Sequence, residues 1–181
     1  MTDSDLKNII ESLIFVSDSP VDIKMIKKAV PTAEARDIRQ AVMELIEIHE
    51  TREGGFVLRE VAGGWQFRTR SAYKEYVKRL VQPSPSRLSK AALETLAIVA
   101  YHQPIIRADV EHIRGVDSGA ILRSLLERKL IRILGKKELP GRPLIYGTTK
   151  RFLEVFNLRS LNDMPSLKEI ESFGSAIAGE D

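Results

Sequence analysis

The chain has 181 residues, 43% hydrophobic and 29% charged, a balance typical of one or two small globular domains and not of a disordered or fibrous protein. The absence of cysteine excludes disulfides, thiolate metal sites and cysteine nucleophiles, and no apolar run approaches the roughly 20 residues of a membrane-spanning helix. Acidic side chains outnumber basic ones 10 to 6 over residues 1–50 and 5 to 1 over 160–181, whereas basic ones prevail 21 to 10 in between.

Three helices are predicted within the first fifty residues. Apolar residues recur every third or fourth position across 6–14, which indicates a helix with one buried face that ends at the turn 18–20. Asp22 is expected to cap a second helix, and Thr32 is expected to cap a third. The apolar stripe of the third helix consists of Ile38, Val42, Leu45 and Ile46.

A β-hairpin and a further helix are predicted next. Apolar runs at 56–61 and 65–67 flank Gly63-Gly64, a pattern typical of two strands joined by a glycine turn. Three helices followed by a hairpin is the order of a winged-helix domain. A helix at 73–80 is expected to pack back onto this unit, and the Pro-Ser repeat at 83–86 then predicts an extended linker.

The same order of elements repeats after the linker, at an offset near 84 residues that falls to 80 in the third helix. Ser89 is expected to cap a helix with Leu93 on its buried face. A short second helix, with Val110 and Ile113 inward, is expected to end at Gly115. A third helix at 121–126 and a hairpin complete this second unit. The strands of the hairpin are expected at 131–134 and 144–148, and a long basic tip at 135–143 joins them.

We therefore predict a mainly α fold with small β wings, built from two tandem winged-helix domains. The first domain is expected at residues 1–82 and the second at 88–160, with the linker at 83–87 between them. A flexible acidic tail is expected at 161–181.

Catalysis is not expected. The histidines at 49, 102 and 112 lack the spacing that places two zinc ligands on one helix face. The glycines at 54, 55, 63 and 64 lie in hairpin contexts, where they serve as turn residues rather than as a phosphate cradle. We predict a protein that is not an enzyme and that uses no cofactor and no metal.

Two readings of the winged helices compete. A DNA-binding regulator would place its third helix in the major groove. The third helix of the first unit, over residues 34–50, carries two basic and five acidic side chains, and that of the second unit, over 117–129, carries three basic and two acidic side chains. This charge gives DNA reading little support, although contact with the DNA backbone stays open through Arg123, Arg128, Lys136 and Lys137. The other reading is a scaffold that binds protein partners.

Several ordered motifs from residue 88 onward resemble the bacterial segregation and condensation protein B family. They are Ala100-Tyr-His-Gln-Pro-Ile105, Ile113-Arg-Gly-Val-Asp-Ser118, and the wing sequence from Pro140 to Thr149. The chain departs from the family pattern at Ile106, where a capping threonine is usual, and at Asn157, where glycine is usual. Asparagine can adopt the left-handed backbone that a glycine would provide there.

The resemblance implies a non-enzymatic subunit of a condensin-like complex that acts in chromosome condensation, segregation and partition during the cell cycle. It implies a homodimer joined through the N-terminal units, which binds the kleisin subunit that bridges the ATPase heads of a structural-maintenance-of-chromosomes protein. DNA would be contacted only weakly or indirectly. Together with the acidic start of the chain, this predicts a cytoplasmic, nucleoid-associated protein with no membrane contact.

Side chains for these contacts are predicted from residue type, since aromatic and arginine residues supply most strong anchors at interfaces. For dimerisation we predict Leu6, Ile9 and Leu13, on a stripe that must also build the first core. For Tyr101 and Tyr146, two of the residues predicted to bind the kleisin, core packing is an equal alternative. The predicted kleisin-binding residues are Tyr101, Ile105, Arg107, Arg142, Leu144 and Tyr146.

Overall fold

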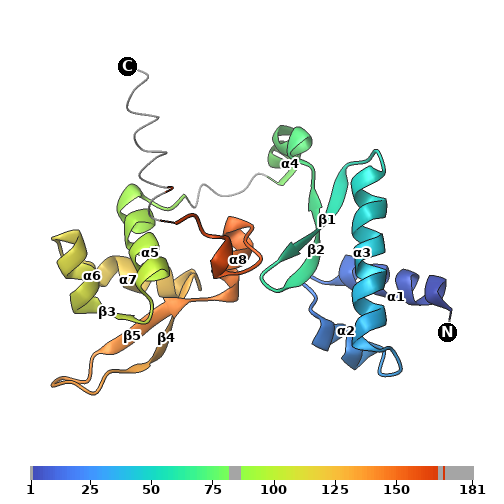
Figure 1. Cartoon of the computed structure of the whole chain (residues 1–181). Coiled ribbons are helices and arrows are strands. Elements are labelled where there is room, and N and C mark those ends of the chain that lie inside the picture. Colours follow the sequence, from blue (N-terminus) through green and yellow to red (C-terminus); the bar gives the residue numbers. More distant parts are fainter. Residues whose placement is uncertain (1, 82–86, 167–168, 170–181) are drawn as a thin grey trace.

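The computed structural model describes residues 2–81, 87–166 and 169. The predicted linker, except residue 87, lies outside the described residues, and so does most of the predicted tail beyond 166. The described elements form two groups, each with a helical layer and a small antiparallel sheet (Figure 1). The predicted class, mainly α with small β wings in two tandem winged-helix units, is confirmed.

The first group contains seven elements. They are α1 (Asp3–Val16), α2 (Ile23–Ala29), α3 (Ala35–Thr51), β1 (Phe56–Val61), β2 (Gly64–Thr69), the 3₁₀ turn η1 (Ser71–Tyr73) and α4 (Lys74–Val81).

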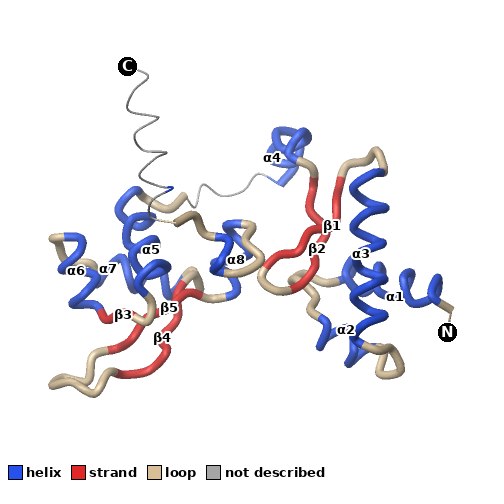
Figure 2. Tube along the Cα trace, in the orientation of Figure 1, coloured by secondary structure: helices blue, strands red, loops and turns tan. Residues whose placement is uncertain are grey.

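The second group contains eight elements. They are α5 (Lys90–His102), β3 (Ile105–Ile106), α6 (Arg107–Arg114), α7 (Gly119–Glu127), β4 (Ile131–Lys136), β5 (Leu144–Thr148), α8 (Lys150–Phe156) and η2 (Leu161–Asp163). Figure 2 shows the strands of the two groups as separate sheets, with orders β1-β2 and β3-β5-β4.

Each group has its own hydrophobic core. The first core is built from the inward stripes of α1 and α3, with Ile10, Ile38 and Leu58 fully buried. The second is built from α5, α7 and the sheet, with Leu96 and Leu125 fully buried. The predicted apolar periodicity therefore locates both cores.

Of the two helix starts predicted from capping residues in the first group, one is confirmed and one is wrong. The Asp22 carboxylate accepts a hydrogen bond from the Met25 amide at 3.0 Å, as predicted for a cap. Thr32 was expected to cap α3, and that prediction is wrong, because α3 begins at Ala35 after Glu34. The buried Ala33 donates its amide to the Val30 carbonyl, so the chain turns further before the helix starts.

The first hairpin turns one residue earlier than its glycine pair suggested. Ala62 and Gly63 occupy the turn with φ of 53° and 75°, and positive φ at both positions defines the type I′ turn that suits hairpins. Gly64 already belongs to β2, where Trp65 pairs with Val21 through two backbone hydrogen bonds of 2.9 Å. A Cβ on Gly64 would lie 2.8 Å from the Val21 carbonyl carbon, so the close backbone approach requires glycine there.

Gly64→Ala is expected to destabilise the chain by about 1–3 kcal/mol, because backbone atoms rather than a flexible side chain oppose the added methyl group. Thermal unfolding followed by circular dichroism measures the effect. Gly55→Ala is the matched control, since a Cβ there meets nothing within 4 Å. Equal melting temperatures for the two variants would contradict the close approach of Gly64 to Val21.

Helix α4 exists as predicted, but it does not pack back onto the first unit. None of its residues is buried, and Tyr76 and Leu80 are 70% and 85% exposed. The expectation of a packed helix is therefore wrong: Val77, the least exposed residue of α4, is only half-buried, and an open hollow lies between this helix and the hairpin. This leaves an apolar helix face open to solvent.

In the second group the predicted helix caps are confirmed, but two residues predicted to be buried are exposed. The Ser89 hydroxyl accepts from the Ala92 amide at 3.2 Å, and Gly115 ends α6 with a φ of 70°. Leu93 and Ile113 were expected to face inward, yet both are exposed, since each lies at the edge of its helix's buried stripe. Ile106 precedes α6 without a side-chain cap.

The two groups touch where the first hairpin meets the end of α8. The Ala62 amide donates to the Leu158 carbonyl at 2.8 Å, and the Arg68 guanidinium donates to the Glu154 carbonyl at 3.3 Å. Asn157, between these two acceptors, adopts the left-handed conformation expected for it, with φ 55° and ψ 41°. The departure from glycine at Asn157 therefore preserves the helix end.

Candidate functional site

Titratable side chains do not gather into a reaction centre in the described part of the chain. No three histidines, aspartates or glutamates among these residues are placed to hold a metal ion. Buried His49 is hydrogen-bonded to Glu11 at 2.8 Å and packed against the rings of Phe56 and Phe67. These contacts give His49 a packing role between α1 and α3. No helix in the described residues is long and apolar enough to cross a membrane.

Two residues predicted for partner contact lie in the second core. Ile105 on β3 and Tyr146 on β5 pair across the sheet, and only 3% and 7% of their surfaces are exposed. Side chains this deeply buried offer little area to a partner. Tyr101, at the end of α5, donates its hydroxyl hydrogen to the Pro165 carbonyl at 2.7 Å and so attaches the segment after η2 to the second unit.

Arg107 is engaged within its own unit. Its guanidinium donates to the Glu111 carboxylate at 2.6 Å and also to the Asp117 carboxylate, and the hydrogen bond that Glu111 accepts raises the pKa of Arg107. The Ser118 amide and then Arg107 donate to Glu111, which lowers the pKa of that carboxyl. The guanidinium also packs so closely on Gly119 that a Cβ there would lie 2.6 Å away. Arg107 therefore holds the α6–α7 turn together.

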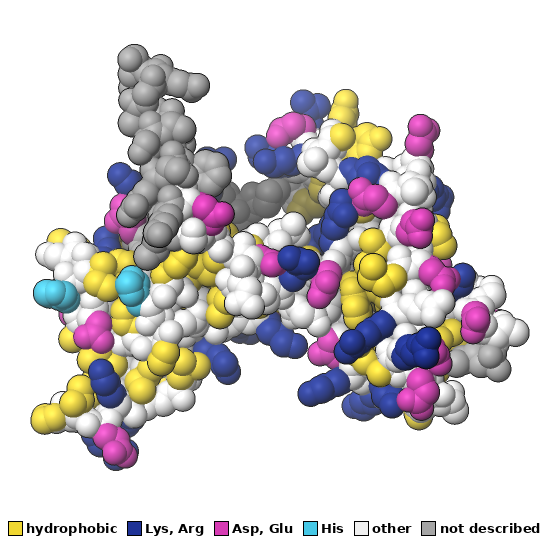
Figure 3. All heavy atoms as spheres, in the orientation of Figure 1, with side chains coloured by type: hydrophobic (Ala, Val, Ile, Leu, Met, Phe, Trp, Pro, Cys, Tyr) yellow, Lys and Arg dark blue, Asp and Glu magenta, His cyan; other side chains and the backbone are white. Residues whose placement is uncertain are grey.

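The second wing presents the predicted residues that remain accessible. Arg142 lies in its exposed tip, where the Arg142 amide donates to the Leu139 carbonyl at 2.8 Å, and Leu144 is half-buried at the start of β5. The strand and tip also expose Ile133, Leu134 and Leu139, which the sequence reasoning missed. We call Ile133, Leu134, Leu139 and Arg142 the wing surface; Figure 3 shows hydrophobic and basic side chains together there.

The three residues predicted for dimerisation differ in exposure. Leu6 is buried in the first core, Leu13 is half-buried against it, and Ile9 is exposed. The sequence reasoning missed Phe15 and Val16, which are 77% and 76% exposed on the same helix. Periodicity did not reveal them, because they lie outside the buried stripe of the helix. Two adjacent apolar residues at the end of a helix were the sequence feature that could have indicated a contact surface. We call Ile9, Leu13, Phe15 and Val16 the α1 outer face.

Two shallow hollows adjoin this face. One is lined by Ile9, Leu13, Val16 and two small polar residues, and the other lies between Phe15, Phe56 and Phe67. The rings of Phe56 and Phe67 meet edge to face at 5.4 Å, and Phe15 approaches Phe67 at 6.5 Å. The outer face thus combines exposed apolar side chains with hollows that a complementary surface can fill.

The residues considered for DNA contact are all exposed. Arg123 lies on α7, Arg128 follows that helix, and Lys136 and Lys137 lie where β4 enters the wing tip. The Lys137 amide donates to the Pro143 carbonyl at 2.9 Å, which closes the base of the tip. The four residues therefore come from two separate elements rather than from one helix face suited to a groove.

The sequence matches one family throughout most of the chain. The family model for the segregation and condensation complex subunit ScpB matches residues 8–167. A segregation and condensation protein B from Syntrophotalea carbinolica is 52% identical over 91% of this chain and 83% of its own length. One from Myxococcus xanthus is 47% identical over 91% of this chain, which spans only 50% of that relative.

Among solved structures, a crystal structure of a dimer of the ScpB N-terminal domain complexed with an ScpA peptide aligns with 28% identity and a TM-score of 0.39. That alignment covers 43% of this chain and 93% of the solved one.

Proposed function

The chain belongs to the segregation and condensation protein B family, and on this premise we propose that it is a non-catalytic scaffold that binds a kleisin subunit bridging SMC ATPase heads. Membership makes it a ScpB-type subunit of the segregation and condensation complex. The observation that carries the proposal is the family match across residues 8–167, which includes both winged-helix units. In this proposal the protein works on the nucleoid in the cytoplasm, in chromosome condensation and partition.

We propose that residues 88–160 act as the kleisin-binding domain and use the wing surface. Exposed apolar side chains next to an arginine are the composition that forms strong anchors when a partner excludes water. Of the six residues predicted from sequence, the exposed Arg142 and the half-buried Leu144 would make direct contact in this proposal, while the buried Ile105 and Tyr146 would support the sheet beneath them.

We propose that residues 1–82 form the dimerisation domain and use the α1 outer face. The support is the exposure of Phe15 and Val16 beside the two hollows, since apolar patches of this kind mark protein contacts. Of the sequence-predicted residues, Ile9 and Leu13 belong to this face, and Leu6 packs behind it in the core.

The wing surface is tested by charge substitution. Ile133→Glu and Arg142→Glu are each expected to weaken binding of a kleisin fragment at least about tenfold, because each variant places a carboxylate in a desolvated contact. Isothermal titration calorimetry measures the affinity. Arg123→Glu is the matched control, with the same charge change on exposed α7 of the same unit. Loss of affinity in the control alone, or in none of the three variants, would refute the assignment.

A further inference from the structure

A basic hollow lies between the first hairpin, η1 and α4. Its volume is about 1070 Å³, and Asn157 of the second group completes its lining. Among the described residues that line it, five are cationic and none carries a carboxylate, and apolar walls are provided by Val57, Val77 and Val81. We call it the α4 hollow. Its cationic residues are Arg59, Arg68, Arg70, Lys74 and Lys78.

Little of this positive charge is neutralised within the chain. Arg59 pairs with Glu50 at 2.9 Å. Arg70 donates to the carbonyls of four residues between 49 and 54, which holds the end of α3 but supplies no opposite charge. Lys74 and Lys78 are exposed and have no ion pair among the described residues. The hollow is therefore a concentrated positive site that attracts an acidic ligand.

One guanidinium nitrogen in the hollow also lacks a hydrogen-bond acceptor. Arg68 uses its terminal nitrogen on the Glu154 carbonyl, but its buried Nε has no partner among the described residues. An unpaired buried donor on a charged group is unfavourable, so an acceptor brought into the hollow would stabilise this guanidinium after a small shift. A carboxylate is the acceptor whose charge matches.

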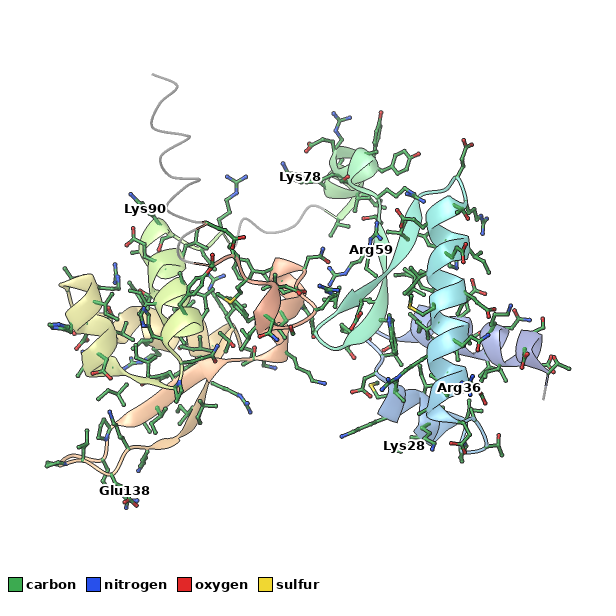
Figure 4. All side chains as sticks on the ribbon, in the orientation of Figure 1. Lys28, Arg36, Arg59, Lys78, Lys90 and Glu138 are labelled. Atoms are coloured by element: carbon green, nitrogen blue, oxygen red, sulfur yellow. The ribbon has the colours of Figure 1, made fainter. Side chains whose placement is uncertain are left out.

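The side of α4 that lines the hollow is partly apolar. Val77 is half-buried and Val81 is 64% exposed, and both line the hollow. Figure 3 shows basic and hydrophobic side chains side by side over α4, and Figure 4 shows Lys78 on α4 and Arg59 on β1 at the same end of the first group. An isolated eight-residue helix is marginal in water, so a partner that covers its apolar side would stabilise α4.

The occupant must satisfy both the positive charge and the apolar walls of the hollow. A DNA backbone supplies negative charge but does not cover valine side chains. A second copy of the same hollow would bring like charges together. We propose that the α4 hollow binds an acidic segment of the kleisin that also carries apolar side chains, as a second contact besides the wing surface. This inference rests on the proposed function and adds the chemistry of a further kleisin segment.

Charge reversal at two lysines tests the inference. Lys74→Glu with Lys78→Glu is expected to weaken kleisin binding at least about tenfold at low salt, with a smaller loss at high salt. The control is Lys24→Glu with Lys28→Glu, both exposed lysines on α2; Figure 4 shows Lys28 at the other end of the first group from Lys78. Val77→Ser with Val81→Ser, which removes the apolar lining that α4 contributes, is expected to weaken binding by a similar factor that salt does not change.

The outcomes separate this inference from the proposed function. If the wild-type chain binds the kleisin fragment and the α4 variants bind equally well, the α4 hollow is refuted while the scaffold function stands. If the wild-type chain does not bind the fragment, the proposed function itself fails. Two other results would also refute the inference: loss of duplex DNA binding with unchanged kleisin affinity, or conversion of the free dimer to a monomer by the lysine variants.

Discussion

Phe15→Glu combined with Val16→Glu is expected to convert the chain from a dimer to a monomer at micromolar concentration. The two side chains are more exposed than almost any other apolar residue of the first group, so a polar change there should not disturb the first core. In a dimer they would be desolvated, and each introduced carboxylate would lose its hydration without a partner. A penalty of about 2–5 kcal/mol per charge weakens association at least about thirtyfold.

Sedimentation velocity of the wild-type chain and the variant measures this change. Val116→Glu is the control, because Val116 is an exposed apolar residue in the second unit. Circular dichroism should give the same helix content for all three proteins. A double variant that remains dimeric would move the interface away from the α1 outer face, and a wild-type monomer would remove the dimer altogether.

Truncation inside the two cores is expected to have the next largest effect. Leu58→Ala in the first core and Leu125→Ala in the second should each destabilise its unit by about 2–5 kcal/mol, since both leucines are fully buried. If residues 1–82 and 88–160 are separate domains, each substitution lowers only one of two unfolding transitions.

Differential scanning calorimetry distinguishes the two transitions. Leu93→Ala serves as the control, because the exposed Leu93 loses little burial when shortened. A single transition that both core variants lower equally would show that the two groups unfold as one unit, joined through the contacts of Ala62 and Arg68 with the end of α8.

Sequence periodicity predicted the architecture well where a buried stripe and a local cap agree. The stripes of α1 and α3, the caps at Asp22 and Ser89, and the left-handed ends at Gly115 and Asn157 all depend on interactions within a few residues of the chain. Thr32 failed because the burial of Ala33, a tertiary effect, delays the start of α3.

The surfaces were harder to predict than the cores. The sequence alone does not tell whether an apolar side chain such as Phe15 or Leu80 is buried or exposed. Helix α4 was therefore expected to pack inward. Conversely, Ile105 and Tyr146 have residue types common at interfaces but lie in the second core. The α4 hollow brings together Arg59, Lys74 and the distant Asn157, a juxtaposition that no local pattern encodes.

The most direct test of the scaffold role is the molar mass of the chain measured by multi-angle light scattering, alone and with a kleisin fragment. The account predicts twice the monomer mass of 20.4 kDa for the free chain, and a heavier stable complex once the fragment is added. A monomeric chain whose mass does not change with the fragment would contradict it.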